Sequence, residues 1–406
     1  MKTTFGGDQE GRRAMAELIS APALVRKKTS MKLLERERAD LERCLPGLDG
    51  LLAETSSAEL ERPGSPGVKM FRDAGGPALV IPIEYKGLGA DPVAAVRIQR
   101  AIGSRSPSLA VATTMHHFSV SSLVLLAAGG GNEWLLLEAI ACQRMLVASG
   151  FAEGRPDGRI LAPTMTATVT GDGLRVSGVK RPCSLARSMD LLTASVIVPG
   201  TDGQGDQLGV ALIPSTDLGV SVTPFWASFA LGGAESDQVT VDNVLVPNDL
   251  VVPTGPADGA HLDEIQTAGF VWFELLMMGS YLGAATALVE RAIAVDRVAD
   301  SEKLTLVTGV EAAMAAVENI AHQIPDGQRD ERLLADALLV RYAVQDAIAA
   351  VVPRAVELLG GVNFMTSDDV GYLAAAVNGL SFHPPARAKM AGPLMEYLTG
   401  SSLRIA

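Results

Sequence analysis

The feature that most restricts the fold is a run of short strand-like segments between two helix-rich parts of the chain. From about residue 145 to residue 253, apolar residues alternate with polar ones, and turns that contain glycine or proline separate the stretches. No helical pattern interrupts the run, which favours a compact antiparallel barrel or sandwich. The seven predicted strands are 145–149, 164–170, 174–177, 191–198, 208–214, 220–223 and 239–246.

Both flanking parts have the apolar spacing of helices. In the first part, Asp91-Pro92 is a typical helix start, with Asp91 as the N-cap and Pro92 in the first turn. In the second part, three long helices are expected, the last of them bent at Pro353 and ended by Gly360-Gly361. These helices are predicted at 266–298, 310–323 and 332–359.

This order predicts a mainly α protein with a β-domain. A hydrophobic content of 48% with 20% charged residues fits a globular chain with a large core. The expected parts are an N-terminal helical domain at 1–144, a middle β-domain at 145–253 and a C-terminal helical bundle at 254–406.

Charge, cysteine content and histidine spacing argue against several classes of function. The net charge of −12 argues against nucleic acid, because no basic stripe is present to neutralise phosphates. Three widely separated cysteines imply no disulfide framework and favour the cytoplasm. The five histidines lack metal-ligand spacing. We expect no signal peptide and no membrane span, since the longest apolar run, 270–289, contains Glu274.

The segment 231–247 is a glycine-containing loop followed by an alternating strand. Val239, Val241, Val244 and Val246 are spaced to face a core. This pattern resembles the middle-domain signature of the acyl-CoA dehydrogenase superfamily, in which a small β-domain leads into C-terminal helices.

Two more segments resemble motifs of the same superfamily, in the same order along the chain. Residues 82–89, Pro-Ile-Glu-Tyr-Lys-Gly-Leu-Gly, are similar to its Pro-x-Glu-Tyr-Gly-Gly-Leu-Gly turn. Residues 176–180 are similar to its strand–Gly–x–Lys lead into the flavin loop. The resemblance covers most of the chain and implies helices, a β-domain and a helical bundle around a flavin.

The resemblance also implies flavin contacts from residues 180–184. Ser184 falls on the position whose hydroxyl bonds the flavin, Pro182 replaces the family's tryptophan, and Cys183 lies between them. A Cys-Ser pair before an Asp-Leu-Leu strand is similar to the reduced-flavin monooxygenases of the same fold. The alternative is that Ser184 only satisfies a turn.

Other cofactor positions depart from the family pattern. Ala152 stands where a flavin-touching hydroxyl is expected, beside a matched Glu153, and Gly360-Gly361 matches the loop on the adenosine side. The Arg-x-x-Phe-Gly motif that holds FAD pyrophosphate across subunits is replaced at 301–306. The implied cofactor is therefore a flavin, either FAD, or FMN or reduced flavin supplied by a reductase.

The glutamate base of the acyl-CoA dehydrogenases has no counterpart at its usual position. Pro384 stands there, with His383 beside it. Some members carry the base on the first long C-terminal helix, where Glu274 is the lone acid in an apolar face. A buried acid needs a partner or a role. The alternative for Glu274 is a salt bridge to an arginine such as Arg387 or Arg291.

The pair His116-His117 is the other candidate site. His116 aligns with a histidine near the flavin in the monooxygenase branch, where an imidazole can donate to a flavin hydroperoxide or act as a base. The alternative is one buried, hydrogen-bonded histidine with a solvent-facing neighbour. His383 allows the same two interpretations.

Three functions are compatible with these residues. The first is hydroxylation or N-oxygenation through a flavin hydroperoxide in specialised metabolism, with Ser184 and His116 near the flavin and His383 as acid–base residue. The absent glutamate favours it. The second is α,β-dehydrogenation of a CoA or acyl-carrier-protein thioester, with Glu274 as a relocated base. The third is a catalytically inactive scaffold.

The resemblance also implies partners. Because the family's flavin site is built across a subunit interface, it implies a homotetramer or homodimer. A small-molecule or thioester-tethered substrate is expected, with a flavin reductase or an acyl carrier protein as the protein that supplies electrons or presents the substrate.

Overall fold

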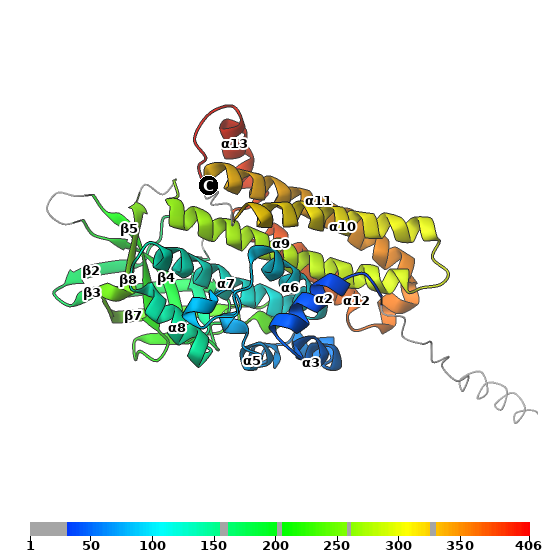
Figure 1. Cartoon of the computed structure of the whole chain (residues 1–406), viewed down its shortest axis with the longest axis horizontal. Helices are drawn as coiled ribbons and strands as arrows, with labels where there is room; N and C mark the ends of the chain where they lie inside the picture. The colour runs from blue at the N-terminus through cyan, green and yellow to red at the C-terminus, as the bar shows by residue number, and fades with distance from the viewer. Residues whose placement is uncertain (1–30, 155–160, 201–204, 258–260, 325–329) are drawn as a thin grey trace, which may run out of the picture. The chain divides into compact units, whose positions relative to one another are not determined.

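The strand-like segments form two four-stranded sheets, ordered β1-β4-β5-β8 and β2-β3-β7-β6 (Figure 1). The computed structural model describes residues 31–154, 161–200, 205–257, 261–324 and 330–406. The two sheets contact each other through β2 and β4, β1 and β3, and β5 and β7, as in a sandwich. The strands are β1 (Val147–Gly150), β2 (Thr166–Thr170), β3 (Gly173–Cys183), β4 (Leu191–Val198), β5 (Gln207–Pro214), β6 (Val220–Thr223), β7 (Asp237–Pro247) and β8 (Val251–Pro256).

Two features of the sheets differ from the prediction. The strand β8 was not predicted, and β1 pairs with β4 in parallel, with Val147 opposite Leu191. The expectation of a purely antiparallel domain was therefore wrong at this edge. A long connection separates β1 from β4 in sequence, and parallel pairing requires such a connection.

The alternating pattern of β7 is confirmed. Val239, Val241, Val244 and Val246 are each at most 2% exposed. Between the two pairs, Asn243 has a φ of 52° and the register with β3 shifts, so the strand keeps the same face buried on both sides of the irregularity.

Helices precede and follow this sandwich in the sequence. The predicted start of α6 is confirmed, because the Asp91 carboxylate accepts a hydrogen bond of 2.8 Å from the Ala94 N–H. The helices are α2 (Glu35–Cys44), α3 (Leu48–Glu54), α4 (Ser57–Leu60), α5 (Gly67–Asp73), α6 (Pro92–Arg105), α7 (Pro107–Ala128), α8 (Glu133–Gln143), α9 (Glu264–Ile293), α10 (Asp300–Gln323), α11 (Glu331–Thr366), α12 (Val370–Ala376) and α13 (Arg387–Leu398).

The central helix is α9, which packs against α6, α7, α10 and α11. Figure 1 shows α9, α10 and α11 running alongside one another. By length and composition, α7, α9, α10 and α11 are each apolar enough to cross a membrane. The most apolar window of α9, however, is 94% buried inside the protein, so its apolarity belongs to the helical core.

The predicted end of the last long helix at Gly360 is confirmed. Within α11, Gly360 has non-helical dihedrals, with φ 84° and ψ 163°, so the first helix ends there and a second helical segment continues to Thr366. No such departure occurs at Pro353. The Arg297 guanidinium donates a bond of 2.6 Å to the Leu359 carbonyl, which accounts for one carbonyl freed by the interruption.

The three predicted parts share contacts within one unit, Leu34–Ala406. The boundary at 144/145 lies between α8 and β1, and the boundary at 253/254 lies inside β8. Residues 1–30 of the expected N-terminal domain lie outside the described residues, as do residues 155–160, which follow Ala152 and Glu153 in the sequence.

Candidate functional site

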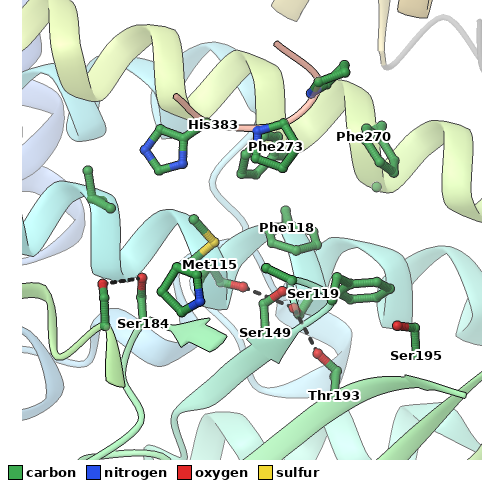
Figure 2. Close-up of a pocket in the computed structure, with 18 of the residues that line it drawn as sticks. Met115, Phe118, Ser119, Ser149, Ser184, Thr193, Ser195, Phe270, Phe273 and His383 are labelled. Atoms are coloured by element: carbon green, nitrogen blue, oxygen red, sulfur yellow. Dashed lines mark hydrogen bonds between the residues drawn. The ribbon is translucent and has the colours of Figure 1, made fainter. Parts of the chain in front are cut away.

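A cavity of about 620 Å³ lies where α7, α9 and the segment 375–389 meet strands β1, β4 and β5. This volume is within the range of ligand sites. Figure 2 shows aromatic side chains from the helices facing hydroxyl side chains on the strands. The helical side includes Met115, Phe118, Phe270, Phe273 and His383, and the strand side includes Ser149, Thr193, Ser195, Leu208, Val210 and Leu212.

Three hydroxyl residues of the strand side form what we call the hydroxyl row: Ser149, Thr193 and Ser195. Ser149 lies opposite Thr193 in the parallel β1–β4 pair. Ser195 follows Thr193 by two positions, so both face the same side of β4. The row therefore exists because β1 and β4 pair in parallel with this register.

A buried ion pair lies next to the hydroxyl row. The Lys180 ammonium is fully buried and donates to the Glu153 carboxylate at 2.9 Å and to Ser195 Oγ at 3.0 Å. Glu153 also accepts bonds from the N–H and hydroxyl of Thr164, at 2.8 and 2.7 Å. Burial raises the pKa of Glu153, but these donors outweigh it and the pKa lies below its usual value. Burial lowers the pKa of Lys180, against the attraction of Glu153.

The predicted flavin-loop residues divide between the cavity and the interior. Ser184, Pro182, Ala152 and Glu153 all line the cavity. Cys183 lies between two of them in sequence but is fully buried, and burial raises the pKa of its thiol to about 12. Cys183 is therefore a protonated packing residue and does not line the cavity.

His383 lies at the cavity wall. Its Nε2 is 2.8 Å from the Tyr281 hydroxyl, and its ring contacts the Phe273 ring edge-on at 6.1 Å between centroids. Burial, with a smaller contribution from the Arg341 charge, lowers the pKa of His383 to about 3. The imidazole is therefore neutral at physiological pH. Tyr281, which sequence reasoning missed, fixes the ring.

Glu274 does not line the cavity. It is fully buried and accepts two bonds from one nitrogen of Arg341, at 2.8 and 3.0 Å. Burial raises the pKa of Glu274 to about 7, against the attraction of Arg341. The alternative interpretation, a salt bridge to an arginine, is confirmed. The suggested partners Arg387 and Arg291 were wrong, because the partner is Arg341.

Arg341 also holds the backbone next to the cavity. Its second terminal nitrogen donates to the carbonyls of Leu380 and His383, at 2.9 and 2.5 Å. The Glu274–Arg341 pair thus fixes the turn that carries His383. A signal for Arg341 was present in the sequence, since it is a lone base inside an apolar helical stretch, as Glu274 is a lone acid.

His116 and His117 lie behind the cavity wall and do not line it. The Val147 N–H donates to His116 Nδ1 at 3.0 Å, so Nε2 carries the proton and donates to the Pro77 carbonyl at 2.9 Å. Burial lowers the pKa of His116 to about 4. Both ring nitrogens are thus engaged with backbone, and a role for His116 next to the flavin gains no support. His117, which the alternative placed toward solvent, is fully buried against Phe71.

Gly360 and Gly361 lie on α11 and do not line this cavity. The structure therefore brings together Ser184, Pro182, Ala152, Glu153 and His383. It leaves the two glycines, Cys183, Glu274 and His116 apart from them.

Known proteins resemble this chain in sequence and in fold. No family model matches the sequence. The chain is 43% identical over 379 residues to isobutylamine N-hydroxylase from Streptomyces viridifaciens, which covers 92% of this chain and 100% of the relative. Among solved structures, FMN-bound TdsC from Paenibacillus sp. A11-2 has a TM-score of 0.76 at 18% identity, covering 90% of this chain and 98% of TdsC.

A third similarity comes from the prolyl acyl carrier protein oxidase AnaB, with a TM-score of 0.76 at 14% identity, covering 90% of this chain and 99% of AnaB. The fold is thus that of the acyl-CoA dehydrogenase-like flavin enzymes. Within that class, the chain belongs to the monooxygenase branch, in the family of isobutylamine N-hydroxylase. It is a flavin-dependent oxygenating enzyme, and the predicted superfamily, fold and type of activity are confirmed.

The residues of the cavity fit a flavin. The hydroxyls of Ser184 and Ser236 are 3.0 Å apart, so the pair uses one of its two protons and keeps the other for a ligand acceptor. Neither hydroxyl has a second partner among the described residues. Pro182 and Ala152 add apolar surface on the same wall. These are the residues that would hold the ring of a flavin.

Proposed function

We propose that this protein N-hydroxylates a small primary aliphatic amine with a reduced flavin. One oxygen atom of dioxygen enters an N–H bond, the other leaves as water, and the reduced flavin provides two electrons. The observation that carries the proposal is the chemistry of the cavity wall. The titratable side chains that line it are the neutral imidazole of His383, the exposed Lys389 and, as the one acidic side chain among the described lining residues, Glu153, which is bound to Lys180 and Thr164.

An amine must be unprotonated to react at its nitrogen. Alkyl ammonium groups have a pKa near that of lysine, about 10.4, so the free substrate is mostly charged. An apolar cavity penalises that charge and favours the neutral amine. The amine therefore loses its proton to water before it binds, and the neutral His383 imidazole, whose ring the Tyr281 hydroxyl orients, can hydrogen-bond the neutral amine. When bound, a reduced flavin supplies the activation of dioxygen.

The thioester dehydrogenase alternative needs a carboxylate base within reach of the substrate. Glu274 lies behind the wall in its pair with Arg341, and Glu153 is occupied by Lys180. Both positions favour oxygenation over abstraction of an α-proton. The identity to an N-hydroxylase over its whole length supports the amine as substrate class.

We further propose FMN as the flavin, delivered in reduced form by a separate reductase in the cytoplasm, and a homotetramer or homodimer as the assembly. The replaced Arg-x-x-Phe-Gly motif removes the cross-subunit group that would hold an FAD pyrophosphate.

The test is turnover of isobutylamine with FMN, a flavin reductase and labelled dioxygen, followed by mass spectrometry. We expect a hydroxylamine that carries one labelled oxygen atom. His383→Ala should reduce its formation by roughly tenfold, the effect of one hydrogen bond to the substrate. Anaerobic bleaching of a bound oxidised flavin by an acyl thioester, without hydroxylamine formation, would instead establish the dehydrogenase.

A further inference from the structure

The cavity faces of two neighbouring strands differ in chemistry. On β5, Leu208, Val210 and Leu212 face the cavity, whereas on β4 the registered partners of Val210 and Leu212 are Ser195 and Thr193. A cavity for a purely hydrocarbon ligand gains nothing from buried hydroxyls, which cost free energy unless they are hydrogen-bonded. The hydroxyl row therefore indicates a ligand with a polar atom at this wall.

The hydroxyl protons of the row show whether this polar ligand atom donates or accepts hydrogen bonds. Thr193 donates its proton to the Ala148 carbonyl at 3.1 Å. Ser195 Oγ accepts a hydrogen bond from the Lys180 ammonium, so its own proton points away from Lys180. Because Ser195 lines the cavity, this proton is available to a ligand there. Ser149 is 8% exposed, and its hydroxyl has no hydrogen-bond partner among the described residues. Two donors, Ser149 and Ser195, are thus available for an acceptor.

The charge behind the hydroxyl row restricts this acceptor further. Lys180 is neutralised by Glu153 at 2.9 Å, so the pair adds no net positive charge to the wall. A carboxylate would need a cation to offset its burial. An alcohol or carbonyl oxygen needs only the two hydroxyl donors.

The position of the hydroxyl row separates it from the predicted flavin contact. Figure 2 shows Ser184 at one end of the group and Ser195 at the other, with Ser149 and Thr193 between them. Phe118 and Phe270 lie across from this part of the strands. A short carbon chain can pack on these rings while an oxygen at its end reaches the hydroxyl row.

We infer that the hydroxyl row is a subsite for an uncharged oxygen of the substrate, so that the natural substrate is an amine that also carries an alcohol or carbonyl group. This inference rests on the proposed amine oxygenation and specifies its substrate class. Ser149 and Ser195 are the specificity residues, and Lys180 is a positioning residue that directs the Ser195 proton into the cavity.

The test compares two amines with the same carbon skeleton: isobutylamine and its analogue in which one terminal methyl carries a hydroxyl. Binding to the FMN-loaded protein is measured by calorimetry without oxygen. We expect the hydroxylated amine to bind about three- to tenfold more tightly, the effect of one neutral hydrogen bond. Ser149→Ala and Ser195→Ala should each reduce that ratio toward one.

Ser122→Ala is the matched control. Ser122 also lines the cavity, but its hydroxyl donates to the Phe118 carbonyl at 3.1 Å, so its removal should leave the ratio unchanged. Equal affinity of the wild type for both amines overturns the subsite. A preference for the hydroxylated amine that persists in both alanine variants, while their affinity for FMN falls, also overturns the subsite, because the hydroxyl row then binds the flavin. A maintained binding ratio without any hydroxylamine product leaves the subsite standing and refutes the proposed reaction.

Discussion

Two buried ion pairs flank the cavity, and they serve it differently. On the helical side, Glu274 of α9 pairs with Arg341 of α11 at 2.8 Å. On the strand side, Glu153 pairs with Lys180 of β3 at 2.9 Å. In both pairs the base is fully buried. Only the second pair reaches the cavity, through Glu153 itself and through Ser195.

The two carboxylates also differ in the direction of their pKa shifts. Burial raises the pKa of Glu274 to about 7, and Arg341 only partly offsets it. The pKa of Glu153 lies below its usual value, because Lys180 and Thr164 outweigh a smaller degree of burial. The Glu274–Arg341 pair, which holds backbone carbonyls, therefore acts as a scaffold. The Glu153–Lys180 pair, with Glu153 on the cavity wall, also determines the hydrogen bonding of the site.

The largest effect should come from removing Arg341, the base of the Glu274–Arg341 pair. Arg341→Met leaves Glu274 without a partner, frees the His383 carbonyl and leaves the Leu380 carbonyl with one bond of 3.3 Å from Gln345. Loss of one partner from a buried pair costs about 3–5 kcal/mol. Urea unfolding should show a loss of this size in the free energy of unfolding.

The matched control is Arg387→Met. Arg387 pairs with Asp346 at 2.8 Å close to the same turn and also contacts the carbonyl and ring of Tyr342, but its side chain and that of Asp346 are 44% and 70% exposed. Exposed pairs contribute little, so its loss should be a small fraction of that of Arg341→Met. Similar losses in the two variants would contradict a scaffold role that is specific to the buried pair.

The pH dependence of stability should separate the two carboxylates. The folded-state pKa of Glu274, about 7, is above its ordinary value. The folded state therefore binds more protons than the unfolded state between these values, and stability is lost as the pH rises through them. Its contribution should fall by up to about 3 kcal/mol between about pH 5 and pH 8.

Unfolding of Glu274→Gln at the same two pH values checks the assignment, since this variant should lack that loss. Glu153 has the opposite sign. Its lowered pKa gives stability that is present above the ordinary value and is lost on acidification through the folded-state value. Glu153→Gln should therefore keep the wild-type difference between about pH 5 and pH 8. A flattened curve in Glu153→Gln would refute the contrast.

Local patterns in the sequence were sufficient for part of the fold and site. The period of two in β7 and the Asp91-Pro92 helix start depend on neighbouring residues, and both are confirmed. The structure also places Ser184 and His383 on the cavity wall, where the resemblance implied contacts with ligand.

The remaining features depend on long-range contacts that a single sequence does not specify. Glu274 and Arg341 are 67 residues apart, and Tyr281 meets His383 across 102 residues. The hydroxyl row depends on the register of a parallel pair, Ser149 with Thr193. One local signal was available, since Thr193 and Ser195 alternate within an otherwise apolar strand, but strand periodicity alone does not say which face meets a cavity.

The smallest of these predicted effects on stability should come from removing Lys180, the base of the Glu153–Lys180 pair. Lys180→Met removes the partner of Glu153, but that carboxylate keeps two bonds from Thr164 and borders the cavity, where a ligand or water can solvate it. We expect a loss of about 2 kcal/mol in urea unfolding, the cost of one hydrogen bond to a charged group. Calorimetry should show the larger consequence, because the Ser195 proton is then free to turn toward Glu153. The affinity for the hydroxylated amine should fall while that for isobutylamine stays unchanged. A loss of stability as large as that of Arg341→Met would mean that both pairs are scaffolds and that the contrast between them is wrong.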